Sequence, residues 1–402
     1  MQRLHNTIME YSWGSTTALA DFLGAPSPNP CPQAELWMGA HPMGSSRLGQ
    51  GSAAPSLIDR IRDDPEGTLG ASVAERFGGE FPFLLKLLAA EEPLSLQAHP
   101  SKQQAVEGFA REEAAGTSRS ASTRCYRDNN PKPEVLYALS PFQALCGFRP
   151  RAETLELLVA LEVRGLGDVH QILHSQAGPT GLRAAFVQLL ATPEAEREML
   201  VAELVAACRR ISKHSGQFRG SVLCALKLAD RYPADIGVVA SLFLNLVKLE
   251  PGQAIELPAG NLHSYLRGFG VELMANSDNV LRGGLTAKHV DAGELARVLH
   301  FEEGPARLVQ TQERSAEETE CVTGAEEFSL RILRPRGGVA EIGEREGPEL
   351  LLCIEESIVV RPHSGDDIAL QRGESLFVAA SDGHYGVSGD GALVRAVVGH
   401  GT

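Results

Sequence analysis

The sequence predicts a mainly β protein with a helical insertion, arranged as two jelly-roll β-barrels plus an α-helical domain. Short apolar runs separated by Gly, Pro and Ser fill residues 1–150 and return after residue 234, which is typical of sandwiches and barrels. Residues 151–233 instead repeat apolar positions at helical spacing. A stretch near residue 260 also recurs near residue 380. These observations predict two related β units interrupted by helices.

The first β unit is expected to consist of residues 1–150 together with residues 234–311. Its strand-like runs are bounded by turn residues and include FPFLLKLL (81–88), PLSLQAHP (93–100) and EVLYALSPFQALCGF (134–148). Because the second part follows the helical region, this unit forms only if two distant segments of the chain pair with each other.

Residues 151–233 are expected to form the helical insertion domain. Thr192 is a suitable N-cap, with Pro193 at the first helical position. Apolar residues at helical spacing follow it, namely Leu200, Leu204, Cys208 and Ile211. We therefore predict a helix that begins after Thr192 and packs one apolar face.

An internal repeat indicates the second β unit. Residues 251–268 align without gaps with residues 372–389. Each copy has a glycine, alternating apolar residues, a small-residue turn and then a histidine, and His263 matches His384. The pattern resembles the strand–turn–strand element of a cupin-type jelly roll. It predicts a C-terminal cupin-like domain at 326–402, after an acidic linker at 312–325, although chance similarity is an alternative.

Composition excludes some partners. The chain has 402 residues and a formal net charge of −14, whereas nucleic-acid binding calls for a basic face. It has no apolar run of the roughly 18 residues needed to span a bilayer, and no apolar segment behind a basic N-terminus. None of the seven cysteines forms a C-x-x-C pair, which fits reduced thiols. A cytoplasmic protein with no nucleic-acid or membrane partner is expected.

One predicted strand presents two metal-ligand types on one face. Side chains alternate along a strand, so in the run LSLQAH (94–99) Leu94 and Leu96 point one way. Ser95, Gln97 and His99 point the other way. An amide oxygen and an imidazole two residues apart are suitably spaced for one metal ion.

Two further segments could complete such a site. Prolines on both sides of Lys132 hold the chain extended ahead of Glu134. His263 follows a small-residue turn, a position typical of metal-binding histidines in jelly-roll barrels. These nitrogen and oxygen ligands without a thiolate suit zinc. Each segment alone is a weak signal, since a lone histidine at a strand end is more often structural.

Taken together, the motifs resemble those of type I phosphomannose isomerases over nearly the whole chain. The motifs are YSWGS (11–15), AELWMGAHP (34–42), LSLQAHPSK (94–102), NPKPE (130–134) and NSDNVLRGG (276–284). The resemblance implies a cupin-type enzyme that interconverts mannose 6-phosphate and fructose 6-phosphate. One departure is Pro131, where many members have histidine before the lysine.

The resemblance also implies roles for individual residues. It places one zinc ion per chain on Gln97, His99, Glu134 and His263. Arg282 stands at the essential arginine of the family, with Lys132 and Asp278 as further catalytic candidates. The implied substrate-binding residues are Trp13, Lys86, Ser95, Glu272 and Lys288. A monomer is expected.

The implied chemistry moves a proton between C2 and C1 of a sugar phosphate through an enediol intermediate. Zinc and Arg282 are suited to stabilise the charge that develops. The general base stays open among Lys132, Asp278 and a metal-linked histidine. For the phosphate, the candidates are Lys86, Ser95 and Arg282, since lysine and arginine both bind phosphate.

Two other functions fit a metal-binding cupin. A non-catalytic sugar-binding protein would keep the metal but would not need Arg282 and Lys132 beside it. A cupin oxygenase would favour a site of two histidines and one carboxylate with iron. The additional ligand Gln97 and the resemblance to a sugar-phosphate enzyme argue against the oxygenase.

Overall fold

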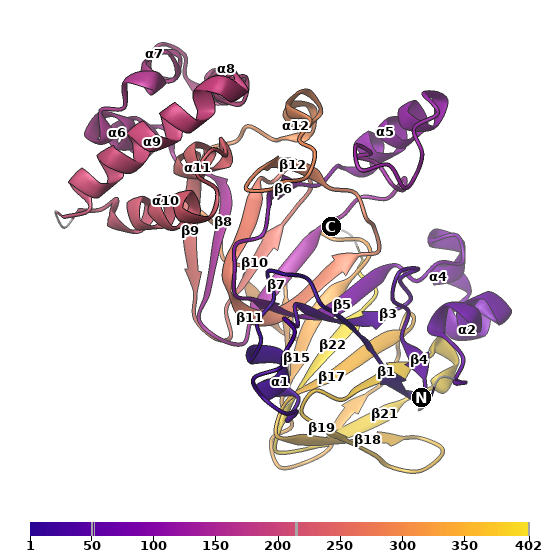
Figure 1. Cartoon of the computed structure of the whole chain (residues 1–402). Helices are drawn as coiled ribbons and strands as arrows, with labels where there is room; N and C mark the ends of the chain where they lie inside the picture. The colour runs from indigo at the N-terminus through magenta and orange to yellow at the C-terminus, as the bar shows by residue number, and fades with distance from the viewer. Residues whose placement is uncertain (50, 52, 214–215, 401–402) are drawn as a thin grey trace.

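The computed structural model describes residues 1–402 except 50, 52, 214–215 and 401–402. Figure 1 shows sheets through the middle and lower part of the molecule, with most of the helices gathered beyond one end of the central sheet. Sheets and helices are mixed, with a helical region between two β segments, but the chain is not mainly β as expected, because helices and strands occupy similar shares of the described residues.

The central sheet has ten strands drawn from both sides of the helical region. One row of neighbouring strands runs in the order β10 (Ala254–Leu257), β7 (Glu134–Ala138), β11 (His263–Ala275), β5 (Phe83–Ala90), β3 (Glu35–Gly39) and β2 (Thr7–Met9). The strands off this row are β12 (Leu281–Gly284), β6 (Leu96–Ala98), β8 (Phe142–Phe148) and β9 (Leu244–Leu249). The predicted pairing of the segments before and after the helices is confirmed.

Strand β11 joins the row of strands given above to the strands that lie off it. Its first residues pair with β6 and β8, whereas residues 268–275 pair with β5 and β7. The change occurs at a register shift near Arg267 and at Gly268, whose φ is 144°. A Cβ at Gly268 would lie 2.4 Å from the Phe142 ring, so glycine permits the close approach. The strand thereby holds side chains from both rows around one interior.

The C-terminal region contains two further sheets. The larger runs in the order β13 (Thr311–Glu313), β14 (Glu318–Cys321), β15 (Ser329–Leu333), β22 (Ala392–Val397), β17 (Glu349–Glu355), β20 (Ser375–Val378), β1 (Gln2–His5) and β4 (Arg47–Leu48). The smaller runs in the order β16 (Ala340–Ile342), β21 (Tyr385–Gly389), β18 (Ser357–Pro362) and β19 (Ile368–Gln371). One apolar core contains residues of both sheets, among them Leu351 and Leu376 of the larger sheet and Val360 of the smaller.

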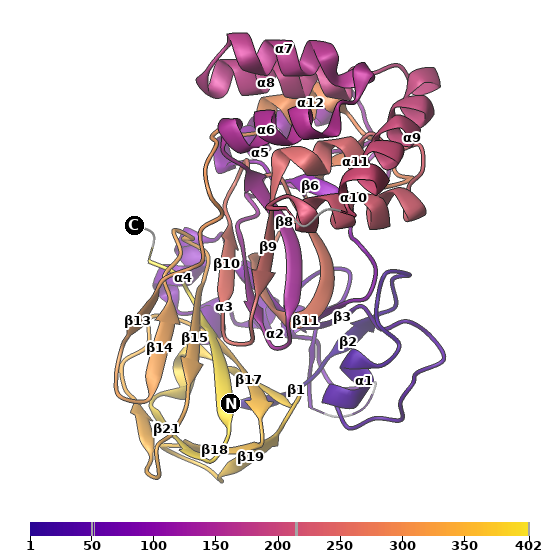
Figure 2. The ribbon, with the colours of Figure 1, turned by 90° about the vertical axis from the view of Figure 1, so that its left-hand side faces the viewer.

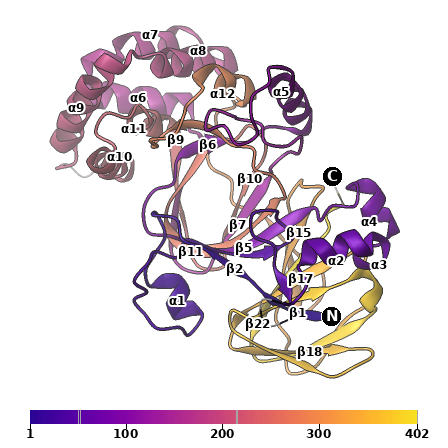
Figure 3. The ribbon, with the colours of Figure 1, turned by 45° about the vertical axis from the view of Figure 1, so that its right-hand side comes forward.

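The N-terminus is integrated into this C-terminal region. Strand β1 pairs with β20 on one side and with β4 on the other. Figure 3 shows the N-terminus beside these C-terminal strands. A second core joins Leu36 and Leu85 of the central sheet to Leu350 and Phe377 of the C-terminal sheet. Apolar packing therefore ties the two β units together.

The predicted acidic linker at 312–325 is wrong. This segment carries β13 and β14, which extend the larger C-terminal sheet. Glu318 and Glu320 are buried there because they pair with arginines of other strands in the sheet, Glu318 with Arg395 and Glu320 with Arg331. The acidic composition alone suggested a solvated segment. It could not show that Arg395, which is distant in sequence, neutralises Glu318.

The helical insertion contains five helices of nine residues or more. They are α6 (Arg151–Leu161), α7 (Gly167–Ser175), α8 (Gly178–Leu190), α9 (Glu194–Ile211) and α10 (Arg219–Arg231). Figure 2 shows them at the opposite end of the molecule from the C-terminal sheets. Thr192 does not cap α9, because its hydroxyl donates to the carbonyl of Leu189 at the end of α8.

Further helices occur outside the insertion, within the two segments 1–150 and 234–311 that were expected to be β. They are α1 (Ala18–Phe22), α2 (Leu57–Asp63), α3 (Pro65–Leu69), α4 (Ala71–Arg76), α5 (Lys102–Ala114), α11 (Gly237–Ala240) and α12 (Ala292–Val298). A complete capping box between Ser101 and Gln104 starts α5. Among the described residues, every helix is too short or too polar to cross a membrane.

The internal repeat has a structural counterpart. Strands β10 and β20 occupy matching positions, and Gly252 and Gly373 have φ values of 91° and 88°. Closed barrels are not seen, however. Each of the three sheets keeps open edges within the described part of the chain. His384 lies exposed before β21, whereas His263 is buried at the start of β11.

Candidate metal centre

Three side chains from three strand ends converge in the central sheet. The Nε2 atoms of His99 and His263 each lie 3.4 Å from a different carboxylate oxygen of Glu134. All three residues are buried, and their ligand atoms lie within 4.8 Å of one another. This cluster brings together residues from segments on both sides of the helical insertion.

Backbone carbonyls orient both imidazole rings. The Nδ1 atom of His99 lies 2.6 Å from the carbonyl oxygen of Asn279, and that of His263 lies 3.0 Å from the carbonyl oxygen of Asn261. A carbonyl only accepts, so Nδ1 donates in each ring and Nε2 keeps its lone pair. This arrangement is typical of metal-binding histidines.

Unsatisfied atoms at the centre of the cluster fit a bound cation. Within the described residues, His99 Nε2 and one Glu134 oxygen are buried without a hydrogen-bond partner. Buried polar atoms are normally hydrogen-bonded, so such a pair needs an explanation. Two imidazole lone pairs and a carboxylate are a donor set suited to a divalent ion.

The protonation states agree with that donor set. Burial lowers the pKa of His99 to about 4, against an opposing effect of Glu134. The ring is therefore neutral near neutral pH. Burial alone would raise the pKa of Glu134, but His99 and Lys132 hold it well below its usual range. The carboxylate is therefore ionised.

Gln97 lies at the edge of the same cluster. It is paired in register with His263 across β6 and β11, and its Nε2 lies 3.4 Å from the Nε2 of His263. Its other amide atom, Oε1, accepts from the Ser95 hydroxyl at 3.3 Å. A half-turn of the amide would place an oxygen beside the histidines, as a fourth ligand requires.

Lys132 and Asp278 line the cavity next to the cluster. This cavity has a volume of about 160 Å³, and Gln97, Glu134 and Tyr265 also line it. The Nζ of Lys132 lies 3.2 Å from a Glu134 oxygen, so the lysine contacts a predicted ligand directly. Two of the three predicted catalytic residues therefore line the same cavity, whereas Arg282 is not among its lining residues.

Asp278 is ionised in this setting. His41 Nε2 lies 3.5 Å from Asp278 Oδ1. Burial opposes ionisation, but the contact with His41 and the charges of nearby Lys132 and Arg127 lower the pKa of Asp278. A carboxylate that stays ionised at neutral pH can accept a proton.

Lys86 and Glu272 form a buried pair at the floor of the cavity. Lys86 Nζ lies 2.8 Å from Glu272 and 3.5 Å from Glu35. The Tyr265 hydroxyl donates to the other oxygen of Glu272 at 2.9 Å. Burial lowers the pKa of Lys86, but its two carboxylate neighbours outweigh that effect and raise it overall. Lys86 is thus a charged residue already committed to protein partners.

The remaining predicted residues lie around the cluster. Arg282 is directly opposite Gln97 in register, on β12, and is half-buried. Lys288 is exposed. The partial burial of its amino group and the charge of Arg282 both lower its pKa. Trp13 stacks on Tyr11, with ring centroids 5.8 Å apart, and Tyr11 lines the cavity. Trp13 therefore lies behind the cavity wall.

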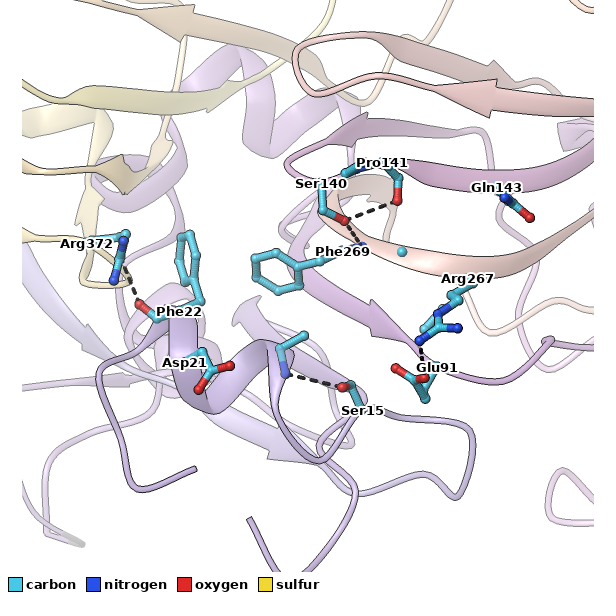
Figure 4. A pocket seen from close by; sticks show the side chains of 13 residues that line it. Ser15, Asp21, Phe22, Glu91, Ser140, Pro141, Gln143, Arg267, Phe269 and Arg372 are labelled. Carbon is cyan, nitrogen blue, oxygen red and sulfur yellow. Dashed lines mark hydrogen bonds and ion pairs between the residues drawn. The ribbon is translucent and has the colours of Figure 1, made fainter. Parts of the chain in front are cut away.

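A second cavity, of about 720 Å³, lies away from the cluster between α1 and the bend of β11. Figure 4 shows Phe22 and Phe269 between Arg372 and Arg267 in this cavity. Both arginines are engaged, Arg267 with Glu91 at 2.6 Å and Arg372 with the carbonyl of Phe22. The possible metal ligands therefore lie at the smaller cavity and not at this one.

Sequence reasoning missed residues that position the site. Asn279 accepts from His99 through its backbone, and its side chain bonds the loop that precedes Lys132. Tyr265 stands two residues after His263 on one strand, so the alternation used for Gln97 and His99 could have found it. Asn279 offered no such signal, because its contacts are to loop backbone.

Comparisons with known proteins agree with this geometry. Residues 1–151 match the family described as phosphomannose isomerase type I, catalytic domain. Mannose-6-phosphate isomerase of Salmonella typhimurium is 38% identical over 399 residues, covering 98% of this chain and 99% of that protein. The protein of that name in Homo sapiens is 32% identical over 405 residues, covering 93% and 92%.

Solved structures give the same result. A variant of phosphomannose isomerase from Salmonella typhimurium superposes with a TM-score of 0.92 at 37% identity, covering 99% of both chains. A zinc-bound mannose 6-phosphate isomerase superposes with a TM-score of 0.90 at 36% identity, again covering 99% of both.

Proposed function

We propose that this chain, which belongs to the mannose-6-phosphate isomerase family, interconverts mannose 6-phosphate and fructose 6-phosphate. The observation that carries the proposal is the buried group of His99, Glu134 and His263 beside a cavity lined by Lys132 and Asp278. An aldose–ketose isomerase needs a cation near the sugar oxygens and a proton acceptor near C2. Both are available at this one place.

The metal would be zinc, as in a superposed relative that is zinc-bound. His99, Glu134 and His263 would hold it, with Gln97 as the fourth ligand. The unpartnered atoms of His99 and Glu134 and the neutral histidine rings support this assignment. When bound, zinc supplies positive charge that polarises a hydroxyl or carbonyl oxygen.

The proton acceptor is Lys132 or Asp278. Both histidines of the cluster donate from Nδ1 to carbonyls and direct Nε2 at the metal position, so neither ring has a free nitrogen for proton transfer. Asp278 is ionised, and Lys132 lies between Glu134 and the cavity. One of these two groups would remove the C2 proton.

The other predicted residues would bind or position the substrate. Arg282 would stabilise the enediol charge, because fixed cations at developing charge are typically a large catalytic factor. Lys86 would position Glu272 instead of binding phosphate, since its ammonium group is already paired with the carboxylates of Glu35 and Glu272. Ser95 would orient the amide of Gln97, and Trp13 would support the wall formed by Tyr11.

The finer organisation is part of the proposal. We infer one cupin-like jelly roll at 1–150 with 234–311, into which the helical domain at 151–233 is inserted, and a second at 326–402. The matching glycines of the repeat support two related units. A cytoplasmic monomer without nucleic-acid or membrane partners also stays a prediction.

The proposal is tested by following the sugar in deuterated water. Zinc-loaded protein is incubated with mannose 6-phosphate, and the products are observed by NMR. Fructose 6-phosphate carrying deuterium at C1 is expected, because an acceptor on the protein exchanges with solvent during an enediol reaction. A zinc-loaded, folded protein that leaves mannose 6-phosphate unchanged would refute the function.

A further inference from the structure

His41 is a buried histidine that lies outside the group of possible metal ligands. It follows β3 and lines the cavity beside the metal cluster, together with Lys132 and Asp278. Its side chain is 3% exposed. Within the described residues, the group that could hold a metal contains His99 and His263 but not His41. The role of His41 in the cavity therefore follows from its hydrogen bonds.

The two ring nitrogens of His41 have the opposite roles to those of the metal-binding histidines. The backbone amide of Met43 donates to His41 Nδ1 at 3.2 Å. A backbone amide nitrogen only donates, so Nδ1 carries no proton and the neutral ring is protonated at Nε2. In His99 and His263, Nδ1 instead donates to a carbonyl and Nε2 keeps its lone pair. His41 is therefore a hydrogen-bond donor at Nε2 and not a metal ligand.

This donor faces the carboxylate of Asp278. His41 Nε2 lies 3.5 Å from Asp278 Oδ1, and catalytic hydrogen bonds are often this long before the substrate binds. Among the described residues, His41 is the sole basic side chain within ion-pair distance of Asp278, whose own side chain is 34% exposed. One carboxylate oxygen is thus directed at the protein, and the other is available to a molecule in the cavity.

Neighbouring contacts hold both partners in this arrangement. The rings of His41 and Trp37 meet edge to face, with centroids 4.8 Å apart and planes at 75°. Trp37 is itself fixed, because its indole nitrogen donates to Glu35 at 2.7 Å. The backbone of Asp278 is fixed as well, since its amide donates to the Asp128 carboxylate at 2.8 Å. The remaining freedom of Asp278 is in its side chain, which is the part that His41 contacts.

We propose that His41 positions Asp278 as the proton acceptor of the isomerisation. This inference rests on the proposed function, and of the two acceptors left open there it takes Asp278. The Nε2–H group of His41 orients the carboxylate through Oδ1, so that Oδ2 takes the C2 proton of the sugar and returns a proton to C1. His41 keeps its own proton throughout and touches no reacting atom. Misplacing a catalytic group by about 1 Å can cost roughly 100-fold in rate, so a partly exposed carboxylate needs such an anchor.

The contacts of Lys132 differ from those of Asp278. Lys132 Nζ lies 3.2 Å from Glu134, so its ammonium group is directed at a metal ligand. Asp278 instead has His41 on one side and the cavity on the other. Burial acts to raise the pKa of Asp278, but the contact with His41 and the charges of Lys132 and Arg127 lower it overall. The carboxylate is therefore ionised and able to accept a proton.

The test uses two amide side chains, each of which replaces one nitrogen of the His41 ring. The short side chain of Asn reaches the position of Nδ1, so His41→Asn keeps an acceptor for the Met43 amide but loses the donor to Asp278. The longer Gln reaches the position of Nε2, so His41→Gln keeps that donor but loses the acceptor. The control is His174→Asn, at an exposed histidine of α7. Zinc content and thermal unfolding are measured first for every variant.

His41→Asn should lower kcat for mannose 6-phosphate roughly 10- to 100-fold with little change in KM. His41→Gln should recover most of the activity, and His174→Asn should match the wild type. Adding His41→Asn to Asp278→Asn should lower kcat no further, because the two residues act as one unit. The opposite order, with His41→Asn active and His41→Gln impaired, would limit His41 to supporting the turn at Met43 and overturn the inference. Additive losses in the double variant would overturn it as well.

A second measurement does not depend on turnover. NMR of ring-labelled histidine shows which nitrogen of a neutral imidazole carries the proton, and comparison with His41→Gln assigns the signals of His41. We expect His41 to be protonated at Nε2, opposite to His99 and His263 in the zinc-loaded protein. A proton on Nδ1 of His41 would overturn the inference. An inactive wild type with His41 protonated at Nε2 would refute the proposed function and leave the contact between His41 and Asp278 intact.

Discussion

Gln97 and Arg282 face each other directly across the antiparallel pair of β6 and β12. Directly opposed residues project to the same face of a sheet, so the guanidinium shares the face of a predicted zinc ligand. The register of two short strands, three and four residues long, therefore sets the position of the proposed catalytic cation relative to the metal.

Replacing Arg282 by Ala should lower kcat about 100-fold or more while zinc stays bound, because the charge acts on the transition state and not on the metal. Steady-state kinetics and zinc analysis of the same preparation check this. The matched control is Arg297→Ala, an exposed arginine paired with Glu294 on α12. Loss of zinc in proportion to loss of activity would assign Arg282 a structural role instead.

Asn279→Ala should weaken zinc binding about 10- to 100-fold, the range typical for residues that orient a metal ligand. The side chain is fully buried and accepts from the backbone amides of Arg127 and Asp128 in the loop that precedes Lys132, and its backbone carbonyl accepts from His99. Competition with a chelator of known affinity measures the effect. Asn129→Ala, an exposed neighbour on that loop, should bind zinc like the wild type. Equal zinc affinity in both variants would contradict the scaffold role.

Lys86→Met should destabilise the protein by about 3–5 kcal/mol, because it leaves the buried carboxylates of Glu35 and Glu272 without their cation. Denaturant unfolding measures the difference, with the exposed Lys248→Met as control. Combining Lys86→Met with Glu272→Gln should cost less than the sum of the single changes, since the two residues are in contact. Additive effects would show that the pair does not interact.

The pH dependence of stability should include a contribution from Glu320. Burial opposes ionisation, but Arg314 and Arg331 outweigh it and lower the pKa of Glu320 in the folded protein. A group with a lowered folded pKa stabilises the fold above its unfolded pKa and loses that contribution as pH falls through the folded pKa. The stability difference between wild type and Glu320→Gln should therefore shrink between about pH 6 and pH 3. A difference independent of pH would contradict the ion pairs.

Much of the site could be predicted from short-range patterns. Strand alternation placed Gln97 and His99 on one face, and the structure brings both beside His263. Two prolines around Lys132 indicated a rigid approach to Glu134, and the two side chains are 3.2 Å apart. These features involve residues that are close in sequence. Local backbone geometry alone is therefore sufficient to predict which of their side chains share a face.

Features that depend on distant partners could not be predicted in the same way. The acidic segment around Glu318 looked like a linker because its partner Arg395 lies far along the chain. Lys86 looked like a phosphate ligand because Glu272, which neutralises it, lies on another strand. Charge pairing is decided by sheet register, which composition does not reveal.

Zinc-dependent isomerisation at His99, Glu134 and His263 is tested most directly by removing the metal and restoring it. Purified protein is stripped with a chelator, and conversion of mannose 6-phosphate is measured before stripping, after stripping and after one equivalent of zinc is added. We predict activity, loss of activity and recovery, with no recovery in His263→Ala. Full activity in the stripped wild-type protein, or recovery in His263→Ala equal to that of the wild type, would contradict the assignment.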